Sequence, residues 1–272
     1  DMRAGIMDIG RSQTGTGLWS ANGGNPNLEP WRANVLDLSF EHYIDKRSYV
    51  AVAGFFKDLK STIYNQNVVY DFTGFPDPCK PSATTVCTPI ITNLGTVNAP
   101  ANGRGGYVRG TEFSGALDLG RVASALDGFG LGGSVSLTQS NIHQANNVNN
   151  SLDGLSGTVF TWTAFYEKHG FQARVSQRYR SVFSTTVRNI WGDTSFTTIQ
   201  PERLVDLQVG YGWESGALKG LSVLLQVNNA TNEAYRTLMS VSDNTGAVPN
   251  LSYPAKFDRY GRQYLLGISY KM

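Results

Sequence analysis

The chain has 272 residues and a formal net charge of +2, from 23 basic and 21 acidic residues. This near balance gives no electrostatic reason to expect a nucleic-acid partner, and the length suits one or two domains. Thirty glycines and 11% aromatic residues, beside only 16% charged residues, favour β-structure and turns. No stretch approaches the roughly 18 consecutive apolar residues of a membrane helix, which argues against a helical membrane protein. Neither a signal peptide nor an initiator methionine opens the chain, so we expect a mature or internal segment.

Alternation of apolar and polar side chains predicts nine strands, because successive side chains of a strand point to opposite faces. In chain order the strands cover about residues 32–43, 48–63, 107–119, 131–139, 160–166, 171–179, 205–211, 221–228 and 261–272. Both faces of the second strand are fairly apolar, so the sequence does not assign one of them to lipid. We interpret residues 1–23 as an external loop that leads into the first strand.

The terminal strand shows the alternation clearly. One of its faces carries Tyr264, Leu266, Ile268, Tyr270 and Met272. The other face carries Gln263, Gly267, Ser269 and Lys271, with Leu265 as the one apolar exception. A single strand of this kind could be half-buried in a soluble sandwich. Repeated strand after strand, the pattern is what a membrane-spanning β-barrel needs, with lipid on one side and water or protein on the other.

Short turns and long loops alternate between the predicted strands. The short turns lie at about residues 44–47, 120–128, 168–170 and 214–219. Outer-membrane barrels sort their connections in this way, with short periplasmic turns and long external loops. Aromatic residues that suit interfacial girdles lie near many strand ends: Trp31, Tyr43, Tyr166, Tyr179, Tyr211 and Trp213. The sequence therefore predicts an all-β transmembrane antiparallel barrel in a bacterial outer membrane, with extracellular long loops and a periplasmic C-terminus.

Cys79 and Cys87 lie eight positions apart in a loop rich in Pro and Thr. No histidine stands near them to complete a metal site, so a local disulfide is the simplest interpretation, and it implies an oxidising compartment. Two unrelated free thiols are the alternative.

Several segments resemble sequence patterns of one family, the TonB-dependent receptors of the Gram-negative outer membrane. Residues 24–30 (GNPNLEP) look like the segment at the head of a mid-barrel strand, and residues 55–63 (FFKDLKSTI) resemble the strand that follows it. Residues 227–237 (VNNATNEAYRT) are similar to the segment after the penultimate strand, although Ala230 stands where a leucine-like residue is usual.

Residues 261–272 (GRQYLLGISYKM) look like the family's closing strand. Its glycine and alternating apolar residues resemble the signal that the outer-membrane assembly machinery reads. The residues that carry this resemblance are Tyr264, Gly267, Tyr270 and Met272, and Met272 departs from the usual terminal aromatic.

The resemblance implies a 22-stranded barrel plugged by an N-terminal globular domain. Residues 24–272 would be its C-terminal portion of about nine strands, and the plug and the segment that engages TonB are missing from this sequence. Nine strands also fit a partial barrel, because single-chain bacterial barrels normally have an even number of strands. Residues 166–180 resemble a carbohydrate-scavenging branch common in xanthomonads and caulobacters.

Sequence patterns for chemistry are weak. Residues 128–133 (GFGLGG) satisfy G-x-G-x-x-G, but they run into a predicted strand, whereas a dinucleotide site needs a helix after the glycines. His42, His143 and His169 show no metal-ligand spacing, and no nucleophile elbow is present. We therefore expect no enzyme, no cofactor and no metal.

Two groups of residues are candidates for substrate contact. Period-2 placement puts Arg174, Arg178, Asp206 and Gln208 on the polar, lumen-facing side. The arginines either pair with carboxylates of the plug or wall, such as Asp206, or bind an anionic substrate. Loop aromatics that could stack on sugar rings or flat chelates are Tyr70, Phe72, Phe75 and Trp191. Packing of loop against loop explains each aromatic equally well.

The resemblance implies active, TonB-dependent uptake of a scarce nutrient, with an oligosaccharide as first choice and a ferric siderophore as second. The expected partners are outer-membrane lipid, the TonB complex through the absent plug, and the small-molecule nutrient. A surface lipoprotein or another envelope protein is a further candidate partner, and no nucleic acid is expected. A passive porin or adhesive barrel without energy coupling is the alternative, and a soluble sandwich that acts as a binding module is a third hypothesis.

Overall fold

The computed structural model describes residues 6–11, 18–80, 87, 89–143, 149–188, 194–241 and 251–271. The chain divides into two compact units. Unit 1 comprises Asp1–Asn34, Lys57–Tyr107 and Asn141–Asn150. Unit 2 comprises Val35–Phe56, Val108–Ser140 and Ser151–Met272.

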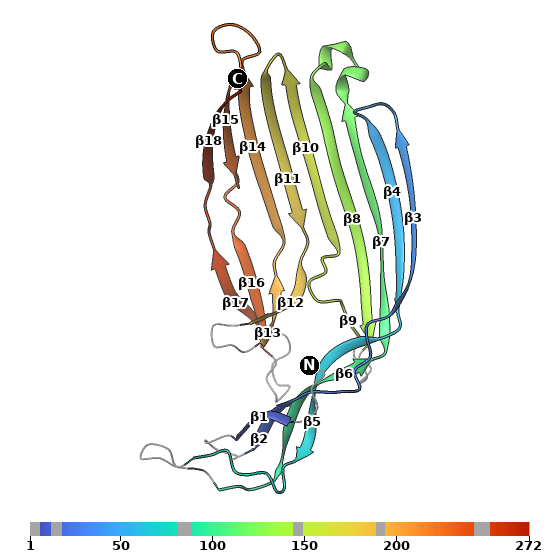
Figure 1. The fold of residues 1–272 in the computed structure, drawn as a ribbon, viewed down its shortest axis with the longest axis vertical. Coiled ribbons are helices and arrows are strands. Elements are labelled where there is room, and N and C mark those ends of the chain that lie inside the picture. Colours follow the sequence, from blue (N-terminus) through green and yellow to red (C-terminus); the bar gives the residue numbers. More distant parts are fainter. Residues whose placement is uncertain are drawn as a thin grey trace. The chain divides into compact units, whose positions relative to one another are not determined.

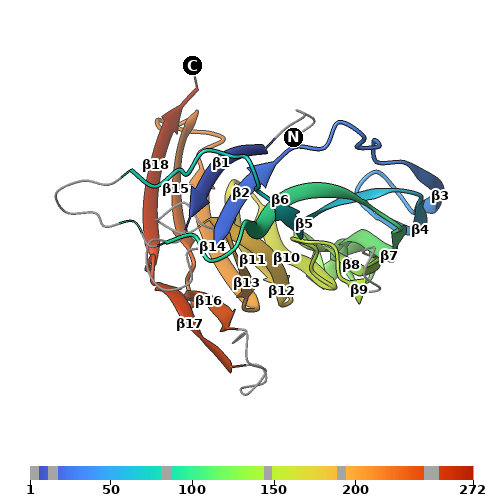
Figure 2. The same ribbon diagram turned by 90° about the horizontal axis from the view of Figure 1, so that it is seen from below.

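A large antiparallel sheet, whose residues fall mainly in unit 2, contains all nine predicted strands. In chain order they are β3 (Ala33–Tyr43), β4 (Tyr49–Leu59), β7 (Gly105–Asp118), β8 (Phe129–His143), β10 (Thr158–Lys168), β11 (Phe171–Arg180), β14 (Glu202–Gly212), β15 (Leu221–Asn228) and β18 (Gln263–Tyr270). Each of these strands pairs with its nearest neighbours in this order, from β3 at one edge to β18 at the other, and the sheet is curved (Figures 1 and 2). The short β9 (Asn149–Asn150) pairs with the end of β8. The predicted all-β fold is therefore confirmed, as an open arc of a barrel wall.

The described residues contain no α-helix and only two 3₁₀ turns, η1 (Leu119–Arg121) and η2 (Ser124–Leu126), between β7 and β8. No helix in the part of the chain that the structure describes is long and apolar enough to cross a membrane.

The strand register separates an apolar face from a polar face, because residues paired across neighbouring strands share a face. One register row across six strands consists of Phe129, Tyr166, Ala173, Val209, Leu225 and Leu266. The next apolar row consists of Leu131, Ala164, Val175, Leu207, Val227 and Tyr264. Seven of the large side chains in these rows are strongly exposed, from 40% for Leu207 to 69% for Leu266, whereas Tyr166, Val175 and Val227 are half-buried. An exposed apolar surface of this size is unstable in water and suits hydrocarbon.

A second sheet, in unit 1, was not predicted. Its strands are β1 (Ile6–Arg11), β2 (Trp19–Gly23), β5 (Thr62–Asp71) and β6 (Leu94–Gly103), in the order β1-β2-β6-β5. The pairing of β2 with β6 is parallel, and the other two pairings are antiparallel. Two of these strands lie in residues 1–23, which we had interpreted as a loop. The buried core of unit 1 consists of Trp19, Ala21, Phe72 and Val97.

The predicted strand at residues 48–63 is in fact two strands. β4 ends at Leu59, and β5 begins at Thr62 in the other sheet. Between them the Ser61 hydroxyl donates to the Pro30 carbonyl at 2.6 Å and accepts from the Arg32 N–H at 3.0 Å. The side chain of Ser61 thus fixes the point at which the chain leaves one sheet for the other.

A third sheet occupies the segments between β11 and β14 and between β15 and β18. It comprises β12 (Phe183–Arg188), β13 (Thr194–Ile199), β16 (Tyr235–Val241) and β17 (Leu251–Asp258), in that order. Figure 1 shows these strands beyond the ends of the main strands, on the side away from the short turns. We had predicted loops here, because Pro201 separates β13 from β14 and no single alternating run crosses it.

Candidate functional site

The polar face of the main sheet carries the four residues predicted to face the lumen. Arg174 on β11 pairs in register with Gln208 on β14, and Gln208 pairs with Gln226 on β15. Arg178 and Asp206 lie on the same two strands and the same face, since they stand an even number of residues from Arg174 and Gln208. The structure therefore brings these side chains together, as the alternation predicts.

Each of the two predicted arginines has an acidic neighbour. Arg178 Nη2 lies 3.6 Å from Asp206 Oδ2, which is the predicted pairing with a wall carboxylate. Arg174 Nη2 donates to Glu167 Oε1 at 3.1 Å, and its guanidinium lies 5.8 Å from the centre of the Phe165 ring. The arginine side chains remain 63% and 47% exposed, so each can also contact a molecule on this side of the sheet. Ion pairs this exposed contribute only about 0–1 kcal/mol to stability.

A turn-forming asparagine next to this face was not predicted. Asn229 follows β15 with a positive φ of 52°, a conformation that asparagine tolerates better than most residues. Its N–H donates to Asp206 Oδ1 at 2.9 Å, and its own Oδ1 accepts from the Glu233 N–H at 2.7 Å. The segment at residues 227–237 therefore connects Asp206 to the turn after β15. An asparagine directly after an alternating strand was the signal that could have found it.

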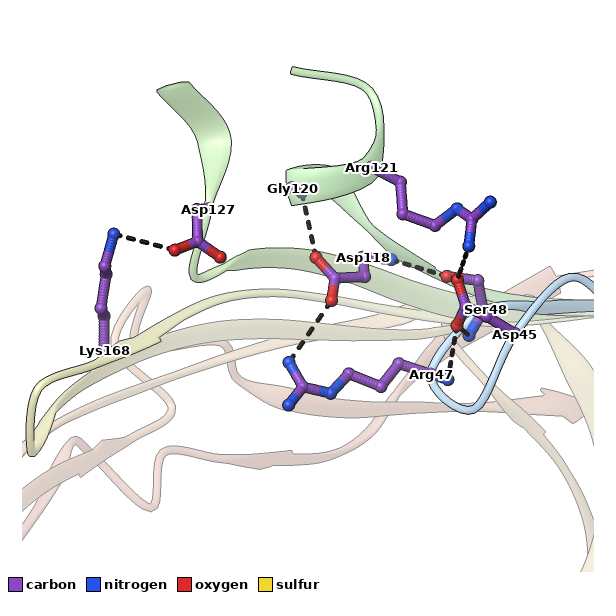
Figure 3. A network of polar contacts seen from close by, with 8 residues as sticks. All are labelled: Asp45, Arg47, Ser48, Asp118, Gly120, Arg121, Asp127 and Lys168. Atoms are coloured by element: carbon purple, nitrogen blue, oxygen red, sulfur yellow. Dashed lines mark hydrogen bonds and ion pairs between the residues drawn. The ribbon is translucent and has the colours of Figure 1, made fainter. Parts of the chain in front are cut away.

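Three of the short turns are joined by a network of charged side chains (Figure 3). Arg121 Nη1 donates to Asp45 Oδ2 at 2.9 Å, and Arg47 Nη1 lies 3.4 Å from Asp118 Oδ2. These two interactions connect the β3–β4 turn with η1 and with the end of β7. A third pair, Lys168 with Asp127 at 2.9 Å, connects the β10–β11 turn with the turn before β8. The buried Ser48 adds a hydrogen bond, because its Oγ accepts from the Asp118 N–H at 3.1 Å.

The turn network balances its own charges, with three acidic and three basic side chains. Hydrogen bonds from the Arg47 and Ser48 N–H groups, with Arg121 as a further partner, lower the pKa of Asp45. The neighbouring ammonium of Lys168 lowers the pKa of Asp127. Both carboxylates are therefore ionised at neutral pH and paired. The arrangement suits a structural connection between neighbouring hairpins better than a binding site for a charged ligand.

The loop aromatics of the prediction lie in or next to the sheet of unit 1. The Phe72 ring stacks on Trp19, with ring centres 5.2 Å apart and an interplanar angle of 8°. Phe72 is 1% exposed, whereas Tyr70 is 40% exposed. Tyr70 and Phe75 pack edge-on against Phe72, at 5.2 and 5.6 Å. Phe72 is therefore the internal anchor of the cluster, and Tyr70 presents a ring to the outside. Trp191 lies outside the described residues.

The predicted disulfide between Cys79 and Cys87 is confirmed. It closes a short ring in unit 1, a few residues after Phe75. Cys79 is buried at 8% exposure, and its N–H donates to Asp77 Oδ1 at 2.9 Å. The disulfide therefore tethers the loop that follows the aromatic cluster.

The other face of the unit 1 sheet carries a row of amide side chains. Asn22 on β2, Asn98 on β6 and Asn67 on β5 are paired in register across three strands. Asn98 Nδ2 donates to Asn67 Oδ1 at 2.9 Å, and all three side chains are exposed. Since each amide offers two donors and one acceptor oxygen, the row presents further uncharged hydrogen-bonding groups to the outside.

The GNPNLEP segment is held by hydrogen bonds within unit 1. Asn25 Nδ2 donates to the Pro100 carbonyl at 3.1 Å. Asn102 donates to the Asn27 carbonyl at 2.9 Å and accepts from the Glu29 N–H at 3.0 Å. These contacts attach the segment to β6, so its asparagines have a structural role.

The glycine run at residues 128–133 also has a structural explanation. No helix follows it, because β8 begins at Phe129. A Cβ on Gly130 would lie 2.2 Å from Phe165 Cζ, so the missing side chain leaves room for that ring. Among the described residues no group of three or more His, Cys, Asp or Glu side chains could hold a metal ion.

Comparison with known proteins identifies the family. Residues 2–230 match the family described as "TonB dependent receptor-like, beta-barrel". The chain belongs to this family. The outer-membrane setting of the barrel follows from this membership, and the apolar face described above is the surface that such a barrel turns to lipid.

Solved structures of TonB-dependent receptors share the fold of this chain. A mutant of the ferric enterobactin receptor PfeA from Pseudomonas aeruginosa, in complex with enterobactin, matches with a TM-score of 0.59 and 14% identity, over 93% of this chain and 33% of that protein. Another PfeA mutant matches with a TM-score of 0.56 and 15% identity, over 96% of this chain and 35% of that protein. The FrpB iron transporter from Neisseria meningitidis matches with a TM-score of 0.50 and 15% identity, over 92% of this chain and 33% of that protein. The chain thus spans about a third of the length of these receptors. A search of curated proteins returned no match.

The residues that resemble the receptor family's assembly signal lie on the edge strand β18. Tyr264 and Tyr270 are on the apolar face, where they are 68% and 63% exposed. Gly267 is on the polar face, paired in register with Leu224. Met272 lies outside the described residues.

Proposed function

We propose that this chain forms the C-terminal wall of an outer-membrane receptor that actively takes up a scarce nutrient. The observation that carries the proposal is the register of the main sheet, which puts apolar rows on one face and paired arginines, glutamines and carboxylates on the other. Such a wall suits a barrel with a polar interior. In this proposal the long loops are extracellular, the C-terminus is periplasmic, and residues 1–23 belong to the extracellular side. TonB acts through a plug domain that this sequence does not contain, and no covalent chemistry takes place.

Energy dependence distinguishes active uptake from a passive porin. Cells that produce the full-length protein should accumulate a labelled substrate in an energised, TonB-containing strain. Accumulation of the substrate should stop when TonB is deleted or when an uncoupler collapses the inner-membrane gradient. Uptake that continues in the TonB deletion strain would identify a passive pore or an adhesive barrel instead.

We propose a neutral oligosaccharide as the first substrate class. Three features support it: the exposed amide row of Asn22, Asn67 and Asn98, the exposed ring of Tyr70, and the resemblance of residues 166–180 to a carbohydrate-scavenging branch. Uncharged amides suit sugar hydroxyls, and an aromatic face suits a sugar ring. A ferric siderophore is the second candidate. The receptors with a similar fold include a ferric enterobactin receptor, but likeness at this level of identity concerns the fold alone.

Growth on single nutrients decides between the two substrate classes. A deletion strain should lose growth on one oligosaccharide as the sole carbon source and keep growth on ferric siderophores under iron limitation. The double variant Asn67→Ala/Asn98→Ala should weaken sugar binding by about tenfold, because it removes several polar contacts. Asn65→Ala is the matched control, since Asn65 lies on the same face of β5 outside the row and should leave binding unchanged. The opposite growth pattern would make an iron chelate the substrate.

A further inference from the structure

A shallow hollow of about 360 Å³ lies on the apolar face of the main sheet. Eight of the thirteen residues that line it belong to the two apolar rows of that face. Its floor is formed by Ala164 on β10 and Ala173 on β11, which are half-buried. Larger side chains flank the floor in register, with Leu131 beside Ala164 and with Tyr166 and Val209 on either side of Ala173. Leu131 and Val209 are 44% and 47% exposed, so the surface of the sheet dips at the two alanines.

An ion pair lies on the same face, at the end of the strands that carries the short turns. Lys168 ends β10 and stands two residues after Tyr166, so both side chains are on the apolar face, about 7 Å apart along the strand. Lys168 Nζ lies 2.9 Å from Asp127 Oδ2, in the turn before β8 (Figure 3). The two charges are therefore on the lipid side of the sheet.

Aromatic rings lie between the ion pair and the hollow. The rings of Phe129 and Tyr166 are 4.5 Å apart, and those of Tyr166 and Phe171 are 6.0 Å apart. Phe129 and Phe171 are 43% and 39% exposed. Rings of this kind mark the headgroup level of a membrane barrel. Along the strands the face thus changes from charged through aromatic to apolar, which is the order of a phospholipid from its headgroup to its acyl chains.

The ion pair has no net charge, but both of its groups have further bonding capacity. The side chains of Lys168 and Asp127 are 37% and 62% exposed. An ammonium has three N–H donors and a carboxylate has about four acceptor positions, so a contact between them uses only part of each group. A neutral pair attracts an ion of one sign only weakly. It matches a headgroup that carries a cation and an anion close together, because each charge then lies beside its opposite.

We propose that this face binds one phosphatidylethanolamine molecule, with its phosphate at Lys168, its ammonium at Asp127 and an acyl chain in the hollow over Ala164 and Ala173. The ammonium of this lipid donates charge-assisted hydrogen bonds to a carboxylate. The trimethylammonium of phosphatidylcholine has no N–H group, and phosphatidylglycerol has no cation. A lipid is the natural occupant, because the apolar face of this family's barrel lies in the outer membrane. The site goes beyond nutrient uptake, since the polar face takes no part in it.

A second lysine–aspartate pair provides an internal comparison. Lys256 Nζ lies 2.7 Å from Asp258 Oδ2, and the Lys256 side chain is 58% exposed. Both residues are on β17, which lies beyond the opposite ends of the main strands (Figure 1). Neither residue lines the hollow. A lipid preference that depends on Asp127 and not on Asp258 would therefore depend on the hollow beside the pair.

Native mass spectrometry of the full-length protein tests the proposal. The purified protein is delipidated and mixed with phosphatidylethanolamine, phosphatidylcholine or phosphatidylglycerol of the same acyl chains. One phosphatidylethanolamine molecule should be retained with about fivefold preference over phosphatidylcholine, which is the upper range for one exposed ion pair. Phosphatidylglycerol should be retained no better than phosphatidylcholine. Asp127→Asn should remove the preference for phosphatidylethanolamine, whereas Asp258→Asn should keep it.

A further variant tests the acyl-chain part of the site. Ala173→Leu fills the floor of the hollow with an apolar side chain and should lower the retention of all three lipids. The gel shift of heated and unheated protein checks that each variant is folded. Equal retention of phosphatidylethanolamine and phosphatidylcholine by the wild-type protein would overturn the proposal, and so would stronger retention of phosphatidylglycerol. Equal loss of preference in Asp127→Asn and Asp258→Asn, or unchanged retention in Ala173→Leu, would also overturn it.

Discussion

The main sheet and the small sheet of unit 1 differ in where their apolar side chains lie. In β18 every residue is exposed, and five large apolar side chains of the other strands, Phe129, Leu131, Leu207, Val209 and Leu225, are 40–48% exposed. In β2 burial alternates with exposure, and Trp19 is 2% exposed. The small sheet therefore contains its own apolar core, whereas the apolar face of the main sheet needs an apolar solvent. Variants that affect one sheet and spare the other test this difference.

The largest expected effect is on the core of unit 1. Phe72→Ala removes the ring that stacks on Trp19 and should lower the free energy of unfolding of this sheet by about 3–5 kcal/mol. Hydrogen exchange should speed up in β2, β5 and β6 and stay unchanged in β14 and β15. Val69→Ala is the control, since Val69 is 70% exposed and should have almost no effect. Equal loss of hydrogen-exchange protection in both sheets would contradict the conclusion that the small sheet has an apolar core of its own.

The apolar face of the main sheet is tested by adjacent residues of β14. Leu207→Arg puts a cation on the lipid face and should destabilise the folded protein in vesicles by about 2–4 kcal/mol if the residue lies near the bilayer midplane. Gln208→Arg puts the same cation on the polar face and should cost much less. Folding into lipid vesicles, followed by the gel shift of the heated and unheated protein, measures both. Equal effects would mean that the two faces are not divided between lipid and interior.

The disulfide should stabilise unit 1 alone. Replacing Cys79 and Cys87 together by Ala removes a ring closed across eight positions, which is worth about 2–3 kcal/mol in chain entropy. Limited proteolysis should then cut the loop after Phe75 faster. Reduction of the wild-type protein with dithiothreitol should reproduce the effect, and the double variant should not respond to the reductant.

A smaller effect is expected in the turn network. Ser48 is 1% exposed and accepts the Asp118 N–H, so Ser48→Ala should cost about 1–2 kcal/mol by leaving that N–H without its partner. Arg47→Ala should change stability by less than about 1 kcal/mol, because the Arg47 side chain is 81% exposed. Denaturant titration of the two variants in detergent compares their free energies of unfolding. A larger loss in Arg47→Ala would show that the ion pair, not the buried hydroxyl, holds the turns together.

The nine main strands could be predicted because their side-chain alternation continues in register from strand to strand. The small sheet could not, because β6 contains glycine, asparagine and Pro100, which are depleted in strands, and Gly95 lies against Trp19 where a Cβ would be 2.4 Å from the Trp19 carbonyl oxygen. The fold of the small sheet depends on the pairing of β2 with β6, which are far apart in the sequence, and no local pattern encodes this pairing.

The candidate site could be predicted in part. Period-2 placement correctly puts Arg174, Arg178, Asp206 and Gln208 on one face. The burial of Phe72 could not be predicted, because its partner Trp19 lies 53 positions away.

The smallest expected effect is the pH dependence of the turn network. Because N–H groups of the β3–β4 turn lower the pKa of Asp45 from its ordinary value of 3.8, folding favours the ionised carboxyl. Its contribution is complete above that ordinary value and is lost as the pH falls through the lower pKa of the folded state. The stability difference between the wild type and Asp45→Asn should therefore stay constant from pH 7 to about pH 5 and shrink below about pH 4. Thermal unfolding of both proteins across this range measures it, and a difference that grows on acidification would mean that the Asp45 carboxyl is protonated in the folded state.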